Sequence, residues 1–79
     1  MISVYFFAGL KEAAGQEKWE IDREEISIGE LRREAAAAFP EAAEVIGRSM
    51  MAVNEEFASD SELVTSSDNA AFLPPVSGG

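Results

Sequence analysis

The group in this sequence best suited to do chemistry is the carboxylate that follows Gly78 and Gly79 at its end. Neither glycine has a side chain, so their backbone can pass through a channel too narrow for other residues. A carboxylate is unreactive at neutral pH until one of its oxygens becomes a leaving group, and adenylation achieves this most simply. We therefore expect an end that is threaded into another protein and activated there.

Two prolines, Pro74 and Pro75, precede this end and indicate where the fold stops. Proline fixes φ and lacks a backbone donor, so a central strand cannot continue through it and the segment remains extended. Residues 74–79 could carry the carboxylate about 20 Å from the fold. We predict a domain over residues 1–73 and a flexible Gly-Gly tail over 74–79, with an ordinary frayed terminus as the alternative.

The composition leaves the rest of the chain little chemistry of its own. The sequence has no cysteine and no histidine, which removes thiol nucleophiles, the usual zinc ligands and the usual proton shuttle. A serine nucleophile would lack a base with a supporting motif. Carboxylates adjacent in the sequence do not face each other on a strand or helix. All three carboxylate pairs of the sequence are interpreted as solvated surface. These pairs are Glu24-Glu25, Glu41/Glu44 and Glu55-Glu56. We predict no metal site and no cofactor bound by this chain.

The charge balance restricts the partners. Fifteen acidic and 6 basic residues give a net charge of −9, so nucleic acids and anionic membranes would repel the chain and a basic protein surface would attract it. The acidity could equally serve solubility. The sequence shows neither a signal-peptide pattern nor a run of about 20 apolar residues. We expect a cytoplasmic protein that binds neither nucleic acid nor membrane.

Five segments have the composition and alternation of strands. The most apolar two should lie side by side in the middle of a mixed sheet, so that the tail leaves from the end of a central strand. The first two form an opening hairpin with a long loop. The predicted strands are residues 2–7, 18–21, 50–53, 57–58 and 70–73.

One segment, residues 28–39, has the spacing of a main helix. Ser27 and Glu30 fit a capping box at its start, and Pro40 disfavours continuation beyond its end. A further helical turn is expected over residues 41–46, ended by Gly47. The apolar stripe predicted to face the sheet is Ile28, Leu31, Ala35, Ala38 and Phe39, and the other face carries Arg32, Arg33 and Glu34. One helix on one face of a mixed sheet is an α+β arrangement.

The ending Phe72-Leu73-Pro74-Pro75-Val76-Ser77-Gly78-Gly79 resembles the tail of the sulfur carrier subunits of molybdopterin synthase, a family with the ubiquitin-like β-grasp fold. The resemblance covers essentially the whole chain and includes residues 4–8, Leu31 and residues 52–54. Gly-Gly alone is shared by many carriers and modifiers, so Pro-Pro-Val-Ser-Gly-Gly is the specific part. The resemblance implies a β-grasp domain with a mixed four- to five-stranded sheet and one main helix on one face.

The resemblance also implies a cycle of sulfur transfer. An activating adenylyltransferase uses ATP to adenylate the terminal glycine, and sulfur then replaces the adenylate as a thiocarboxylate. The tail enters the large, catalytic subunit of a heterotetrameric synthase and donates sulfur to cyclic pyranopterin monophosphate. This chain would be non-catalytic, with Gly79 as the sulfur bearer and Gly78 as its slender neighbour. The implied partner-binding residues are Phe7, Lys11, Phe57, Phe72, Leu73, Pro74, Pro75 and Val76, for whose apolar members ordinary core is the alternative.

Three other functions remain open for a small domain that ends in Gly-Gly. They are a thiamine-pathway sulfur carrier, a ubiquitin-like modifier joined to target lysines through Gly79, and a non-covalent adaptor. One segment also departs from the resemblance, because Ser66-Ser67-Asp68-Asn69 stands where the family has an acidic turn with glycine. Ser67 therefore predicts a different turn geometry there.

Overall fold

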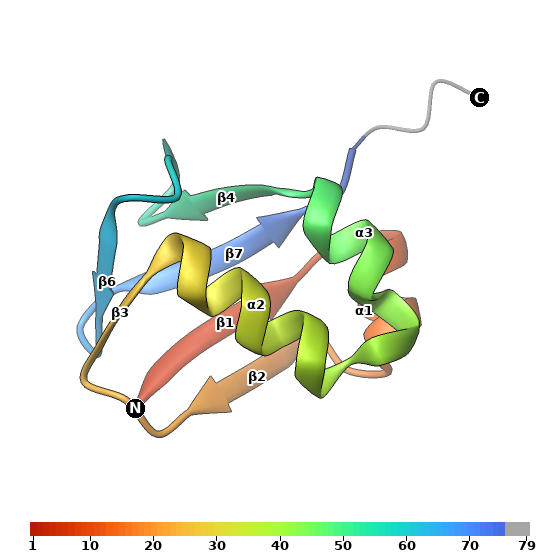
Figure 1. Cartoon of the computed structure of the whole chain (residues 1–79), viewed down its shortest axis with the longest axis horizontal. Coiled ribbons are helices and arrows are strands. Elements are labelled where there is room, and N and C mark those ends of the chain that lie inside the picture. The colour runs from red at the N-terminus through yellow and green to blue at the C-terminus, as the bar shows by residue number, and fades with distance from the viewer. Residues whose placement is uncertain (76–79) are drawn as a thin grey trace.

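The computed structural model describes residues 1–75, and its main sheet has five strands in the order β2-β1-β7-β4-β5 (Figure 1). β1 and β7 run parallel and the other neighbours run antiparallel, so the sheet is mixed, as predicted. The strands are β1 (Ile2–Phe6), β2 (Lys18–Ile21), β4 (Met50–Val53), β5 (Glu56–Ala58) and β7 (Asn69–Leu73).

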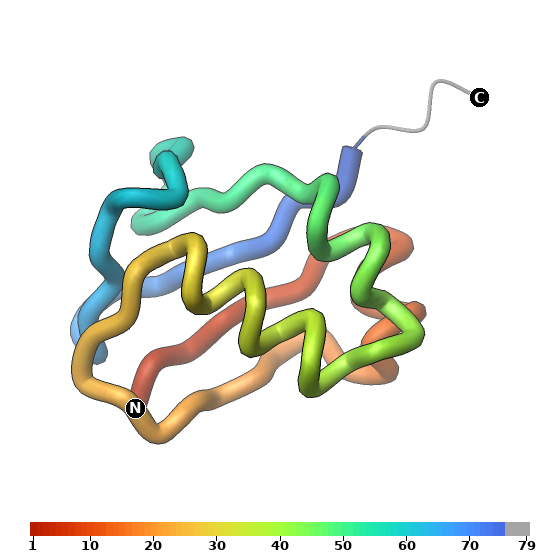
Figure 2. The backbone as a smooth tube through the Cα atoms, viewed as in Figure 1, coloured from red at the N-terminus to blue at the C-terminus, as the bar shows by residue number. Residues whose placement is uncertain are grey.

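The two most apolar strands lie side by side at the centre of the sheet, which confirms the predicted arrangement. Val4 lies opposite Ala70, and Phe6 lies opposite Phe72. These four residues are fully buried or nearly so, whereas their neighbours along each strand are only partly buried or exposed. Figure 2 shows the backbone of β7 passing between β1 and β4 toward the C-terminal end of the described chain.

Helix α2 (Ile28–Ala38) covers one face of this sheet and begins where the sequence predicts (Figure 1). Ser27 Oγ accepts a hydrogen bond from the Glu30 amide at 3.2 Å, which satisfies one free donor of the first turn. The Glu30 carboxylate lies 3.5 Å from the Arg23 guanidinium. The structure therefore forms the first half of the predicted capping box and uses Glu30 in an ion pair.

The apolar stripe of α2 is shorter than predicted. Ile28, Leu31 and Ala35 are fully buried, but Ala38, the last residue of the helix, is exposed. Phe39 is partly buried, and its ring meets that of Phe6 edge to face at 5.2 Å. The core between α2 and the sheet is therefore completed by an aromatic contact from the residue that follows the helix.

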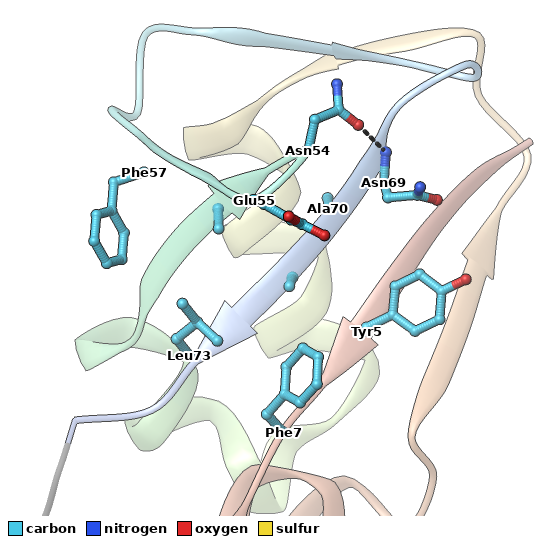
Figure 3. A pocket seen from close by; sticks show the side chains of 10 residues that line it. Tyr5, Phe7, Asn54, Glu55, Phe57, Asn69, Ala70 and Leu73 are labelled. Carbon is cyan, nitrogen blue, oxygen red and sulfur yellow. Dashed lines mark hydrogen bonds between the residues drawn. The ribbon is translucent and has the colours of Figure 1, made fainter.

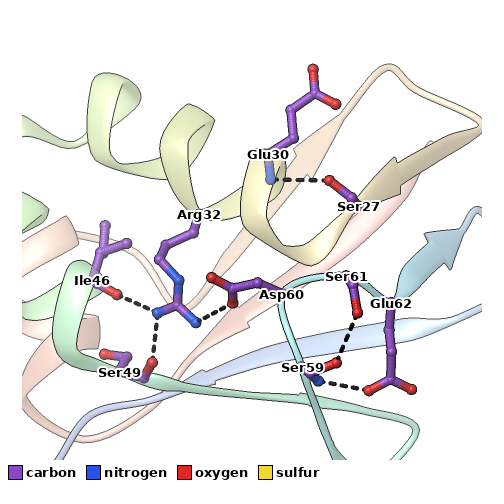
Figure 4. Close-up of polar contacts among 9 residues, drawn as sticks. All are labelled: Ser27, Glu30, Arg32, Ile46, Ser49, Ser59, Asp60, Ser61 and Glu62. Carbon is purple, nitrogen blue, oxygen red and sulfur yellow. Dashed lines mark hydrogen bonds and ion pairs between the residues drawn. The ribbon is translucent and has the colours of Figure 1, made fainter.

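Arg32 of α2 is not on a free solvent face, contrary to the prediction (Figure 4). Its guanidinium donates to the carbonyl oxygens of Ile46 and Ser49 at 2.9 and 2.6 Å, and to Asp60 Oδ1 at 3.1 Å. The side chain is 20% exposed. Arg32 thus joins α2 to the segment before β4 and to the loop that contains Asp60.

Residues 1–75 also contain three short helical segments, α1 (Gly9–Ala14), η1 (Pro40–Ala42) and α3 (Ala43–Arg48). α1 lies in the long loop of the opening hairpin. The prediction that Gly47 ends a helical turn is wrong, because α3 continues through it to Arg48. Ser49 ends this helix instead, where its amide donates to the Ile46 carbonyl at 3.2 Å and its hydroxyl to the Val45 carbonyl at 2.7 Å.

A second, two-stranded sheet was not predicted. It pairs β3 (Glu25–Ser27) with β6 (Leu63–Thr65) and places Ile26 opposite Val64, and both side chains are buried. This pair adds to the core at the end of the molecule where α2 begins (Figure 1). Among residues 1–75, no helix is long and apolar enough to cross a membrane.

Candidate docking face

The face of the main sheet opposite α2 carries a shallow hollow of about 660 Å³ (Figure 3). Strand alternation forms it, because side chains next to buried ones along a strand point to the opposite side of the sheet. We call this surface the helix-free face. The hollow is lined by Tyr5, Phe7, Ala52, Asn54, Glu55, Phe57, Asn69, Ala70, Ala71 and Leu73.

Large apolar side chains are exposed on the helix-free face. Phe57 is 68% exposed and Phe7 is 49% exposed, and both line the hollow. Met50, which is 53% exposed, pairs with Leu73 at the edge of the same surface. Single exposed apolar residues are common, but a contiguous group around a hollow is typical of a surface that another molecule covers.

Three of the residues predicted to bind a partner meet on this face. Phe7 directly follows β1, Phe57 lies in β5 and Leu73 is the last residue of β7, and the three line one hollow (Figure 3). They are far apart in the sequence, and the sheet brings them together because β7 lies between β1 and β4, with β5 next to β4. The sequence prediction thus names side chains that the fold places together, while their role in binding stays a prediction.

Phe72 points to the opposite side. It is fully buried, and its ring stacks on that of Phe6 with the centroids 5.8 Å apart. The alternative of ordinary core therefore describes Phe72, because alternation along β7 turns it away from the face that Leu73 shares. Phe72 supports the sheet and does not line the hollow.

Lysines border the Tyr5 and Phe7 side of the helix-free face. Lys18 Nζ lies 5.8 Å from the centre of the Tyr5 ring. Lys11, another predicted partner-binding residue, lines a smaller hollow beside Phe7, and its Nζ is 3.6 Å from Glu17 Oε2. Lys11 is half exposed, so it lies near the apolar surface but already has an acidic neighbour.

The chain leaves the sheet directly beside this face. β7 ends at Leu73, as predicted, and Pro74 is partly buried while Pro75 is exposed. The predictions for Val76, Gly78 and Gly79 fall outside the described residues. Within residues 1–75, no three His, Cys, Asp or Glu side chains are grouped so that they could hold a metal ion.

The turn between β4 and β5 forms another edge of the hollow. Its two residues, Asn54 and Glu55, have φ values of 53° and 70°, the pattern of a two-residue type I′ hairpin turn. Asn54 also binds the start of β7: its amide donates to the Asn69 carbonyl at 2.8 Å, and its Oδ1 accepts from the Asn69 amide at 3.0 Å. Glu55 was not predicted to line a binding surface, although Asn followed by one residue between two short strands is a signal for a hairpin turn.

The turn between β6 and β7 is held by Asp68. Its carboxylate accepts from the Thr65 amide at 2.9 Å, from the Asn54 side-chain amide at 2.9 Å and from the Thr65 hydroxyl at 3.1 Å. These hydrogen bonds, first that from the Thr65 backbone, lower the pKa of Asp68 below its ordinary value. Among the described residues, the turn at 66–69 has no positive φ, so Ser67 fits where a glycine was expected from the resemblance.

Comparisons with known proteins agree with this fold. A small archaeal modifier protein 1 from Methanosarcina acetivorans superposes with a TM-score of 0.82 at 25% identity, over 99% of this chain and 95% of that one. A complex of subunits 1 and 2 of the molybdopterin-converting factor from Helicobacter pylori 26695 contains a chain that superposes with a TM-score of 0.70 at 25% identity, over 99% and 97%. The predicted ubiquitin-like β-grasp fold is thereby confirmed.

Comparisons of the sequence find relatives that match almost the whole chain. The molybdopterin synthase sulfur carrier subunit of Escherichia coli (strain K12) is 35% identical over 81 residues, covering 100% of both chains. The counterpart of the same name from Dictyostelium discoideum is 34% identical over 96% of this chain and 93% of its own. The model of the ThiS family matches residues 4–79. A chain with this fold, matched by that model almost from end to end, belongs to the ThiS family.

Proposed function

We propose that this chain is the sulfur carrier subunit of a molybdopterin synthase and that Gly79 carries the sulfur. The observation that carries the proposal is the position of Leu73, which is both the last residue of β7 and part of the lining of the apolar hollow. A partner that covers the helix-free face therefore meets the start of the tail. The names of the similar proteins support this function, and the Helicobacter pylori complex supports a larger subunit as the partner.

The proposed chemistry takes place at the carboxylate of Gly79. A carboxylate oxygen attacks the α-phosphorus of ATP, and pyrophosphate leaves. Hydrosulfide then attacks the acyl carbon of the adenylate, and AMP leaves with the electron pair of the broken C–O bond, which yields a thiocarboxylate. ATP is bound by the activating adenylyltransferase and not by this chain.

Transfer of the sulfur follows in the large subunit, within a heterotetramer. The thiocarboxylate sulfur attacks a carbon of cyclic pyranopterin monophosphate and displaces an oxygen substituent. Water then attacks the acyl carbon and the acyl C–S bond breaks, so the sulfur stays on the product and Gly79 returns to the carboxylate. Gly78 lets the chain fit a narrow channel because it has no side chain. The β-grasp domain itself supplies a docking surface and an anchor for the tail.

Apolar contacts should dominate docking over charge pairs. Burial of an exposed side chain such as Phe7 or Phe57 contributes about 1.5 to 3 kcal/mol. An exposed ion pair such as one made by Lys11 contributes less than about 1 kcal/mol. Leu73, Pro74, Pro75 and Val76 would continue the contact from the sheet along the tail.

Intact-mass analysis tests the proposal. The full chain is incubated with ATP, its activating enzyme and a hydrosulfide source, and the mass should rise by the difference between one sulfur and one oxygen atom at Gly79. A chain that lacks Gly78 and Gly79 is the control and should keep its mass. An unchanged mass of the full chain with an enzyme that forms the adenylate would refute the proposal.

The likeness to a small archaeal modifier protein favours one second candidate, conjugation to other proteins. It would use the same adenylate, but a lysine amine would attack the acyl carbon in place of sulfur. Branched peptides that join Gly79 to lysine side chains in digests of the cell's proteins would support this candidate. Their absence, together with the sulfur exchange, would support the carrier.

A further inference from the structure

Glu55 is the only charged residue among the described residues that line the hollow. Figure 3 shows its carboxylate extending from the β4–β5 turn over β7, on the same side of the sheet as Tyr5 and Phe7. Within residues 1–75, this carboxylate makes no ion pair, whereas Glu30, Glu34 and others do. The Glu55 carboxylate, a hydrogen-bond acceptor, thus lies over an apolar surface and is not paired with a cation from residues 1–75.

The backbone conformation at position 55 is unfavourable for a glutamate. A φ of 70° at the second position of a type I′ turn favours glycine, and Asn-Gly is the preferred pair for such a turn. The chain has the preferred Asn54 but carries a glutamate where glycine would fit best. Residues held in sparsely populated backbone conformations cluster at active sites and ligand-binding sites.

The charges around the hollow are asymmetric. Glu55 lies at the β4–β5 turn without an ion pair among residues 1–75, whereas Lys18 over Tyr5 and Lys11 beside Phe7 are paired with Glu20 and Glu17. A partner whose surface bears a cation at one side can satisfy this arrangement in one orientation only. The net charge of −9 further favours a basic surface during encounter.

We propose that Glu55 is a specificity-determining residue that accepts a hydrogen bond from an arginine of the protein covering the helix-free face. The inference rests on the proposed function, in which that protein is the large synthase subunit. A guanidinium is planar, so it can lie against the aromatic rings of the hollow while it donates two hydrogen bonds to one carboxylate. Closure of the hollow excludes water and strengthens this pair over an exposed one.

The test compares Glu55→Gln with Glu56→Gln, which removes the same charge from the next residue. Glu56 is exposed but does not line the hollow, because alternation turns it to the other side of β5. Binding of the full chain to the large synthase subunit is measured by calorimetry at low and high salt. We expect Glu55→Gln to weaken binding about fivefold at low salt and to reduce its salt dependence. Glu56→Gln should bind within about twofold of the unchanged chain.

A third variant, Glu55→Gly, separates binding from folding. It removes the carboxylate and relieves the strain, so it should unfold at a higher temperature than the unchanged chain and yet bind as weakly as Glu55→Gln. Binding of Glu55→Gly at full strength would overturn the inference, as would equal weakening by the two glutamine variants. Dimerisation of the chain alone through this face, abolished by Glu55→Gln, would also overturn it.

The two proposals fail in different ways. If the unchanged chain did not bind the large subunit and Gly79 did not exchange oxygen for sulfur, the proposed function would fail and this inference with it. If both occurred and the variants at positions 55 and 56 behaved alike, only the role of Glu55 would fail.

Discussion

Met50 lies opposite Leu73 in the antiparallel pair of β4 and β7. Both side chains point to the helix-free face, because the next residue along β4, Met51, is buried against the core. Leu73 is also the last residue before the prolines. The pair therefore marks the point where the apolar surface meets the start of the tail, and a partner that receives the tail has to pass over it.

The first prediction concerns Met50. Met50→Ala should weaken binding to the large synthase subunit about three- to tenfold, because about half of this side chain would become buried in the complex. Its effect on the free energy of unfolding should stay within about 0.5 kcal/mol. The matched control is Met51→Ala, which truncates a buried side chain that is 1% exposed and leaves a cavity in the core. It should lower the free energy of unfolding by about 2 to 5 kcal/mol. Urea unfolding and calorimetric titration measure the two quantities, and a reversed order of effects would contradict the assignment of faces.

A second prediction compares two phenylalanines. Phe57 is 68% exposed on the helix-free face and Phe72 is fully buried. Phe57→Ala should leave the unfolding midpoint nearly unchanged and weaken partner binding at least tenfold, as expected for an aromatic anchor. Phe72→Ala should lower the free energy of unfolding by about 3 to 5 kcal/mol. Full affinity of Phe57→Ala would show that the partner does not cover this face.

A third prediction concerns the three hydrogen bonds of Arg32. Arg32→Met keeps the apolar stem but leaves the Ile46 and Ser49 carbonyls without their charged donor. We expect a loss of about 1.5 to 3 kcal/mol in the free energy of unfolding, measured with urea. Arg33→Met is the control, because Arg33 is exposed on the same helix, and it should change this free energy by less than about 0.5 kcal/mol. Equal effects of the two variants would contradict the role assigned to Arg32.

The fourth prediction follows from the lowered pKa of Asp68. Since the pKa is lower in the folded chain than in the unfolded chain, the stabilisation is complete above the ordinary aspartate pKa. It is lost as the pH falls through the folded value. Asp68→Asn should therefore be less stable than the unchanged chain at neutral pH, and the difference should shrink below about pH 4. Urea unfolding from pH 7 to pH 3 measures this, and a difference that does not depend on pH would contradict it.

The segments with many apolar residues could be predicted from the sequence. Residues 2–7 and 70–73 have an apolar content that fits only the centre of the sheet, and their pairing follows from it. α2 could be predicted because its cap at Ser27 and the proline after it act locally. The tail ending was specific enough to indicate the family, which the comparison over residues 4–79 confirms.

The elements that were missed depend on distant partners. β3 and β6 each contribute one buried side chain, Ile26 and Val64, and neither segment has an apolar pattern of its own. Their pairing joins segments that are far apart in the sequence, with α2 and β4 between them. Helical spacing alone places Arg32 on the solvent face of α2. Its acceptors, the carbonyls of Ile46 and Ser49, lie at the end of α3, so the sequence of α2 does not reveal them. Gly47 was interpreted as a stop signal, but α3 continues through it and ends at Ser49.

The residues of the helix-free face could be predicted only in part. The resemblance pointed to Phe7, Phe57 and Leu73, but alternation along the strands decides which apolar residues are exposed. The same rule could have excluded Phe72, which is adjacent to Leu73, and it could have added Tyr5. Glu55 required knowledge of the turn, since the sequence alone does not show which of two adjacent glutamates faces the hollow.

The parallel pairing of β1 and β7 has a mechanical consequence. A pull on the chain at Pro75 is directed along β7, which is hydrogen-bonded on one side to β1 and on the other to β4. The ladders on both sides are then loaded in shear, so their hydrogen bonds resist together and are not opened one after another. A force that acts along β7 at this end of the sheet is therefore shared by both ladders.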